Sequence, residues 1–286
     1  MIKEIIRGSS KAVIDTKGAE LKSLIIDGRE IMWCADPAFW GKSSPILFPA
    51  IGNVKNNETI ISGKTVKLTK HGFARDNEFD LYKSNDNSAI FVKKFSPENT
   101  GFPFDCQLSL TYTIFNDRLM ISYTVMNLNS FDDMPFCIGA HPAIACDNLD
   151  NCTIEFSKRE TASTPVMNLE NRMFESENRI ERLKNAKKLS LNYDMFDNDV
   201  VYFDNIKSDS VTFKEGSKIL ATISWQGFTS LGLWTPAGKR AGFLCIEPWC
   251  GSDDYDNDNG IFADKKGIQT AKPNTIKKYT MTISAQ

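Results

Sequence analysis

The stretch QLSLTYTIFNDRLMISYTVM, residues 107–126, decides the fold class of this 286-residue chain. Apolar and polar residues alternate from Gln107 to Ile114, and they alternate again from Leu119 to Met126. A two-residue period is typical of strands that bury one face, and Asn116-Asp117 between the two runs is typical of a tight turn. The stretch therefore predicts a β-hairpin.

The same pattern recurs along the chain. SVTFKEGSKILATISW, residues 210–225, predicts a second hairpin that turns at Glu215-Gly216. Only two stretches indicate helix: Asp36–Trp40 predicts a single turn, and Asn178–Ala186 predicts a short surface helix. Many short strands with few helices predict an all-β protein, a large antiparallel β-sandwich. Because no repeat or interdomain linker is visible, we expect one domain over residues 1–286. Further strands are predicted at Ala12–Asp15, Leu21–Ile26, Ala89–Lys93, Val200–Phe203, Phe243–Ile246 and Lys278–Ile283.

Composition excludes several classes of function. The net charge is −2 and basic residues form no stripe, so nucleic acid is not an expected partner. The longest nearly apolar run, Pro45–Gly52, is too short to cross a membrane. Glu4 and Arg7 interrupt the segment where a signal peptide needs an apolar region. These features predict a soluble, cytoplasmic protein.

Metal and nucleotide signatures are absent from the sequence. None of the seven cysteines belongs to a C-x-x-C pair, so we expect reduced thiols packed as small apolar side chains rather than a zinc site. Asp253–Gly260 resembles a calcium loop, but its glycine is misplaced and its twelfth position is Lys265. A solvated acidic turn is expected there. With no P-loop or Rossmann glycine pattern either, no cofactor is predicted.

The chain has only two histidines, and both stand beside glycine and turn residues. His71 lies in KHGFARDNEF, residues 70–79, and His141 lies in GAHPAI, residues 139–144. Pro142 biases His141 towards an extended backbone. Turns at the ends of strands present side chains to ligands from a rigid scaffold, so both histidines are candidate site residues.

A third motif is FLCIEPWCGSDD, residues 243–254. Residues 244–246 predict a buried strand, with Glu247 at its end and Trp249 close behind. Aromatic rings stack on the apolar faces of sugars, and carboxylates accept hydrogen bonds from hydroxyl groups. Glu247 and Trp249 therefore indicate a sugar site.

These motifs, together with LGLWTP at residues 231–236, resemble those of the aldose 1-epimerase (galactose mutarotase-like) family and most of all its bacterial LacX-type branch. The resemblance covers nearly the whole chain and implies a large antiparallel β-sandwich. It also implies that Glu247 is the general base, that His141 is the general acid, and that His71 binds and orients the sugar near its ring oxygen.

The resemblance implies further contacts to the sugar. Asp199 matches by position an aspartate that binds hydroxyl groups. Where the family usually has an arginine, this chain has Asn53 and Lys55, which become candidate contacts, as does Arg75. The implied partner is a small sugar, no metal or cofactor is required, and the chain is expected to be a monomer or a homodimer.

Three alternatives stay open. A hexose-6-phosphate 1-epimerase would need an arginine cluster for the phosphate dianion, and the chain offers only Lys55, Lys70 and Arg75. A non-catalytic carbohydrate-binding protein would not need an acid paired with a base. A glycoside hydrolase normally requires two opposed carboxylates, and Glu247 is the only strong candidate.

Overall fold

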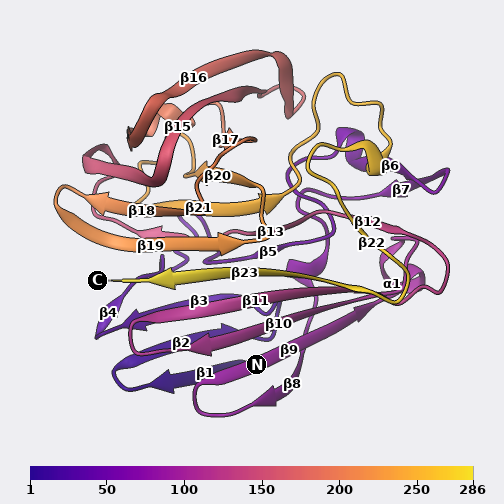
Figure 1. The fold of residues 1–286 in the computed structure, drawn as a ribbon, viewed down its shortest axis with the longest axis horizontal. Helices are drawn as coiled ribbons and strands as arrows, with labels where there is room; N and C mark the ends of the chain where they lie inside the picture. Colours follow the sequence, from indigo (N-terminus) through magenta and orange to yellow (C-terminus); the bar gives the residue numbers. More distant parts are fainter. Residues whose placement is uncertain (286) are drawn as a thin grey trace.

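A computed structural model describes residues 1–285, and nearly all of its regular structure is antiparallel β (Figure 1). The two predicted hairpins are confirmed, since β10 pairs with β11 and β18 pairs with β19. Both belong to a nine-stranded sheet with the order β16 (Met173–Ser190), β15 (Cys152–Asn168), β18 (Ser210–Glu215), β19 (Lys218–Gln226), β23 (Ile276–Ser284), β11 (Arg118–Asn127), β10 (Cys106–Ile114), β9 (Ser88–Phe95) and β8 (Asp80–Ser84).

A second large sheet supplies the strands around the pocket described below. Its order is β17 (Val201–Phe203), β20 (Ser230–Trp234), β21 (Phe243–Cys250), β13 (Ile138–Ala140) and β5 (Ile46–Leu47), and β14 (Ala143–Ala145) also pairs with β21. There are three smaller sheets. The first has the order β1 (Ile2–Arg7), β2 (Ser10–Asp15), β3 (Leu21–Ile26) and β4 (Arg29–Glu30), and the other two are the pairs β6 (Glu58–Ile61) with β7 (Lys64–Lys67) and β12 (Met134–Phe136) with β22 (Gln269–Ala271).

Helical segments in the described residues are short connections between strands. The one α-helix is α1 (Pro97–Thr100), and the 3₁₀ turns are η1 (Lys55–Asn57), η2 (Ala74–Asp76), η3 (Leu149–Asn151), η4 (Tyr193–Phe196) and η5 (Phe262–Asp264). Asp36–Trp40 forms the predicted single turn, because the N–H groups of Phe39 and Trp40 donate to the Asp36 carbonyl. No helix within residues 1–285 is both long and apolar enough to cross a membrane.

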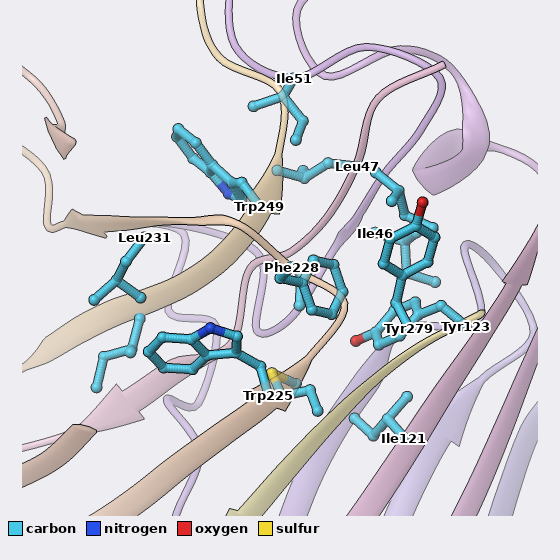
Figure 2. Packing of buried hydrophobic residues seen from close by; sticks show 14 of the residues in the cluster. Ile46, Leu47, Ile51, Ile121, Tyr123, Trp225, Phe228, Leu231, Trp249 and Tyr279 are labelled. Carbon is cyan, nitrogen blue, oxygen red and sulfur yellow. The ribbon is translucent and has the colours of Figure 1, made fainter. Parts of the chain in front are cut away.

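The two large sheets share an apolar core. Every second residue of β10 and β11 is buried, as the alternation predicted, and Leu110 lies opposite Tyr123. Figure 2 shows Trp225 of β19, Leu231 of β20 and Trp249 of β21 in the same cluster. Burying each large apolar side chain contributes about 1.5–3 kcal/mol, so the alternating pattern fixes which face of each strand turns inward. The predicted all-β sandwich is confirmed.

One predicted helix is a strand. Ile180 and Leu183, within residues 178–186, are spaced as on a helix face. In the structure they belong to β16, which forms a long antiparallel arm with β15 at the top of Figure 1. The pairing contains several register shifts, and each shift changes which side chains face inward. As a result Leu183 is buried while Ile180 is exposed, and the two-residue period is hidden.

The prediction that the cysteines pack as small apolar side chains is confirmed for six of the seven. All seven are free and six are buried, whereas Cys34 is exposed.

Candidate active site

Glu247 lies inside β21 and not at a strand end, which corrects the position expected from the sequence. β21 pairs with β20 on one side, where Glu247 lies opposite Gly232, and with β13 and β14 on the other. The side chain is 1% exposed, and it lines a pocket of about 260 Å³. The other lining residues are Trp40, Lys70, His71, Arg75, His141, Asp199, Val200, Trp234, Trp249 and Asp253.

His141 stands where the chain leaves the β21 ladder between β13 and β14. These two short strands pair with opposite ends of β21, and the connection between them is His141-Pro142. The Pro142 carbonyl accepts a hydrogen bond from the Ile246 N–H, which anchors the connection. The break in the ladder puts His141 beside Glu247, with Nε2 3.1 Å from Oε2.

Burial controls the protonation of this pair. It raises the pKa of Glu247 well above the ordinary value, and the charges of Asp199 and Asp253 add to the rise against the opposing effect of Lys70. Burial also lowers the pKa of His141 to about 3. Both shifts disfavour a net charge, so we expect the pair to hold one exchangeable proton over a wide pH range. Neither Glu247 Oε2 nor His141 Nδ1 makes a hydrogen bond with the described residues.

His71 is oriented by an unusual backbone turn. Its φ is +66° and that of Gly72 is +70°, and this left-handed region is uncommon for residues other than glycine. The turn directs Nδ1 at the Gly52 N–H, which donates to it at 3.1 Å. In a neutral ring the proton then sits on Nε2. Burial, followed by the charge of Lys70, lowers the pKa of His71 well below the ordinary value, so His71 is a neutral hydrogen-bond donor.

Aromatic rings form the wall around His141. Trp40 stacks on its imidazole, with ring centroids 5.1 Å apart and 23° between the planes. Trp234 meets both rings edge-on. Trp249 lies deeper, at 2% exposure, within the core of Figure 2. A Cβ atom on Gly232 would come 2.9 Å from the Trp249 indole, so the glycine makes room for this ring.

Charged groups of both signs line the rest of the pocket. Asp199 Oδ2 lies 3.6 Å from Lys70 Nζ. Arg75 donates to the Lys70 carbonyl at 2.9 Å. Its Nε is buried 3.6 Å from an oxygen of Asp76 and makes no hydrogen bond within residues 1–285. A guanidinium with an unused buried donor is well suited to bind an acceptor on a ligand.

The predicted solvated acidic turn, residues 253–260, is wrong for its first two acids, because Asp253 and Asp254 are only 2% and 5% exposed, whereas Asp256, Asn257 and Asn259 are exposed as predicted. Asp254 is buried against Lys265 as an ion pair. Asp253 Oδ1 accepts hydrogen bonds from the backbone and side-chain nitrogens of Asn53, at 2.6 and 2.8 Å. Gly52 lies so close that an added Cβ would meet the Asp253 carboxylate at 2.1 Å. Burial raises the pKa of Asp253.

The family model for aldose 1-epimerase matches residues 3–284 of this chain. The chain belongs to the aldose 1-epimerase family. It is 33% identical over 285 residues to Protein LacX, chromosomal, of Lactococcus lactis subsp. lactis, a match that covers 94% of each chain. The solved structure of a galactose mutarotase-like protein from Lactobacillus casei is 27% identical in sequence and superposes with a TM-score of 0.91. The superposition covers 99% of each chain. A galactose mutarotase related enzyme from Lactobacillus acidophilus is 26% identical at the same TM-score of 0.91, with 100% of this chain and 97% of that chain covered.

Six of the eight predicted site residues line the pocket, and two lie outside it. Asn53 does not line the pocket, but its side-chain amide donates a hydrogen bond to Asp253, which does. The Lys55 side chain is exposed, and its backbone N–H donates to Asp254 at 2.7 Å. The six that meet in the pocket are His71, Arg75, His141, Asp199, Glu247 and Trp249.

Five lining residues were not among the predicted site residues: Trp40, Lys70, Val200, Trp234 and Asp253. The sequence named Lys70 only as a possible contact to a phosphate. Trp234 belongs to LGLWTP, one of the motifs that indicated the aldose 1-epimerase family, so a signal for it existed. Trp40 ends a single turn, and Asp253 is the first residue of an ordinary acidic run. Nothing local distinguishes these two from surface residues.

Proposed function

We propose that the protein interconverts the α and β anomers of an aldose by acid–base opening and closing of the sugar ring. One observation carries the proposal: His141 Nε2 and Glu247 Oε2 lie 3.1 Å apart, buried, at the wall of a pocket. The pocket volume of about 260 Å³ is close to the lower end of the range for ligand sites, roughly 300–1,000 Å³. This size suits one sugar ring rather than a chain of sugars.

In the proposed reaction Glu247, as a carboxylate, takes the proton of the C1 hydroxyl. His141, as an imidazolium, gives its proton to the ring oxygen, and the bond between C1 and the ring oxygen breaks. The aldehyde rotates about C1–C2, and ring closure on the other face reverses both transfers. Positioned groups of this kind contribute about 10²- to 10⁴-fold each.

His141 and Glu247 together carry the same number of protons before and after ring opening. Before ring opening the proton is on His141, and after ring opening it is on Glu247, so the pair has no net charge in either state. Burial raises the pKa of Glu247 and lowers that of His141 to about 3, which favours the second arrangement. A pair of this kind stabilises the ring-opened state without leaving an unpaired charge in a buried site.

The other lining residues are proposed to hold the sugar. His71 donates from Nε2, since its Nδ1 is occupied by the Gly52 N–H. Asp199 and Asp253 accept hydrogen bonds from hydroxyl groups, and Trp40 offers an aromatic face to the apolar side of the ring.

A hexose 6-phosphate is the second candidate substrate, and one observation favours it. Arg75 lines the pocket with an unused, buried Nε donor, and Lys70 lines the same pocket. A phosphate dianion would accept from the guanidinium and be attracted by the ammonium group. This candidate uses the same pair, His141 and Glu247, for the chemistry.

Polarimetry tests both candidates. Freshly dissolved α-D-glucose, α-D-galactose and glucose 6-phosphate are each followed with wild type, Glu247→Gln and Glu58→Gln. Glu58 is exposed on β6 and serves as the matched control. We expect wild type and Glu58→Gln to accelerate relaxation of at least one sugar, and Glu247→Gln to lose about 10²- to 10⁴-fold. Full activity in Glu247→Gln would refute the mechanism.

A further inference from the structure

Cys245 lies next to the proposed acid–base pair and has no part in the proposed reaction. It precedes Glu247 by two residues on β21, so the two side chains leave the same face of the strand. A ring nitrogen of His141, the Cys245 sulfur and a Glu247 oxygen all lie within 4.8 Å of one another, and all three residues are buried. We call these three residues the His–Cys–Glu group.

The donor atoms of this group suit a borderline-soft divalent ion. Nitrogen, sulfur and oxygen donors are the ligands of Zn²⁺, which binds them at about 2.0–2.3 Å in tetrahedral sites. Neighbouring ligands of such a site are about 3.3–3.8 Å apart. His141 Nε2 and Glu247 Oε2 are 3.1 Å apart, and the three donors lie within 4.8 Å of one another, so a side-chain rotation that moves the Cys245 sulfur closer is needed for all three to bond one ion. Three protein ligands leave a fourth position open.

Two further observations point to a ligand at this place. Glu247 Oε2 is buried, and although His141 Nε2 lies 3.1 Å away, the oxygen makes no hydrogen bond of good geometry within residues 1–285, whereas buried acceptors are nearly always paired. His141 and Glu247 both line the pocket, which gives an ion a path from solvent. The three residues also come from strands β13, β14 and β21 or their connection, so the sheet fixes their spacing.

We infer that the His–Cys–Glu group binds Zn²⁺ or a similar borderline divalent ion, and that the bound ion inhibits the protein by occupying the acid–base pair. The inhibitory part rests on the proposed function, whereas the binding part does not. Binding replaces the thiol proton of Cys245 by a bond to the metal, and this proton goes to solvent. Because His141 Nδ1 has no partner in the described residues, and outer partners contribute about 10- to 100-fold to metal affinity, the site is a modest binder.

Cobalt(II) is the probe, because a thiolate bound to it absorbs in the near ultraviolet. Co²⁺ is titrated into wild type, Cys245→Ala and Cys250→Ala. Cys250 is a matched control, since it is a second buried cysteine of β21 and lies outside the group. We expect the thiolate band in wild type and Cys250→Ala, its loss in Cys245→Ala, and its displacement by Zn²⁺. Thermal melting shows whether each variant is folded, and Cys245→Ser replaces the alanine variant if that one is not.

A second measurement addresses inhibition. Zn²⁺ is expected to slow mutarotation by wild type and Cys250→Ala, and to act on Cys245→Ala only at concentrations at least about tenfold higher. A band that persists in Cys245→Ala, no band in wild type at millimolar Co²⁺, or equal inhibition of all three proteins would overturn the inference. If wild type gives the band but turns over no sugar, the metal site stands and the proposed function fails. Turnover without the band gives the reverse result.

Discussion

Replacing Glu247 with glutamine is expected to stabilise the protein while removing the proposed activity. Glu247 is 1% exposed within β21, and burial raises its pKa well above the ordinary value of 4.5. Glutamine has nearly the same shape, and it has no charge that burial would disfavour. Sites arranged for catalysis often reduce stability in this way.

The magnitude follows from counting protons. In the unfolded chain Glu247 loses its proton near pH 4.5, whereas in the folded protein the pair with His141 keeps one proton. Folded wild type therefore binds one proton more than unfolded wild type, so its stability falls as the pH rises from 4.5 towards the raised pKa. The variant has no such proton at this position, and the neutral His141 contributes equally to both proteins. One proton corresponds to a slope of at most about 1.4 kcal/mol per pH unit, so the advantage of glutamine is expected to grow as the pH rises from about 5 towards the raised pKa of Glu247.

Urea unfolding at pH 5, 6 and 7 measures this difference in the free energy of unfolding. Wild type, Glu247→Gln and the exposed control Glu58→Gln are compared at each pH. The control is expected to differ from wild type by less than about 0.5 kcal/mol at every pH. A stability difference for Glu247→Gln that does not change with pH, or that shrinks as the pH rises, would mean that Glu247 is ionised and the pair holds no extra proton. The reasoning would then be refuted.

Three further predictions concern the pocket. Burial lowers the pKa of His141 to about 3 and raises that of Glu247. The mutarotation rate is therefore expected to be independent of pH between about pH 5 and pH 8. A change of rate centred near pH 6.5 would show that His141 titrates alone. Trp40→Ala is expected to raise KM by up to about tenfold in steady-state polarimetry, since an aromatic contact contributes about 0.5–1.5 kcal/mol. The control is Tyr82→Ala, which removes an exposed aromatic ring outside the pocket. Gly52→Ala is expected to lower the urea midpoint and the rate together, because its φ is +63° and the new Cβ would meet the Asp253 carboxylate at 2.1 Å; unchanged kinetics would show that Asp253 can move at no cost.

The sandwich could be predicted because its hairpins are local. Residues 107–126 contain both strands and the turn between them, and the observed register pairs Leu110 with Tyr123 across that turn. Residues 178–186 could not be predicted in this way. Their strand, β16, depends on pairing with β15 through several bulges, and a partner outside the segment decides its conformation. Register shifts interrupt the two-residue alternation of apolar side chains in such a strand, and the remaining spacing happens to match that of a helix.

Pro248 explains why Glu247 was expected at a strand end. Proline cannot donate to a ladder and usually marks an edge or an end. In β21 the N–H of Ile246 points to the β14 side, where it donates to Pro142. Residue 248 points to the same side, because the direction alternates with every residue. The missing donor therefore faces the place where His141-Pro142 has left the ladder, and the strand continues to Cys250 without losing a hydrogen bond there.

The raised pKa of Glu247, on which its proposed role depends, comes from several segments of the chain at once. Its raised pKa comes first from burial in β21, and then from the charges of Asp199, before β17, and Asp253, after β21. Asp253 is itself buried, and Asn53, 200 residues earlier, donates two hydrogen bonds to it. The motif around Glu247 could indicate a general base, since it names the residue type and its place in a family. It could not indicate the protonation state, because in a chain with many acids only the fold decides which three of them meet around one pocket.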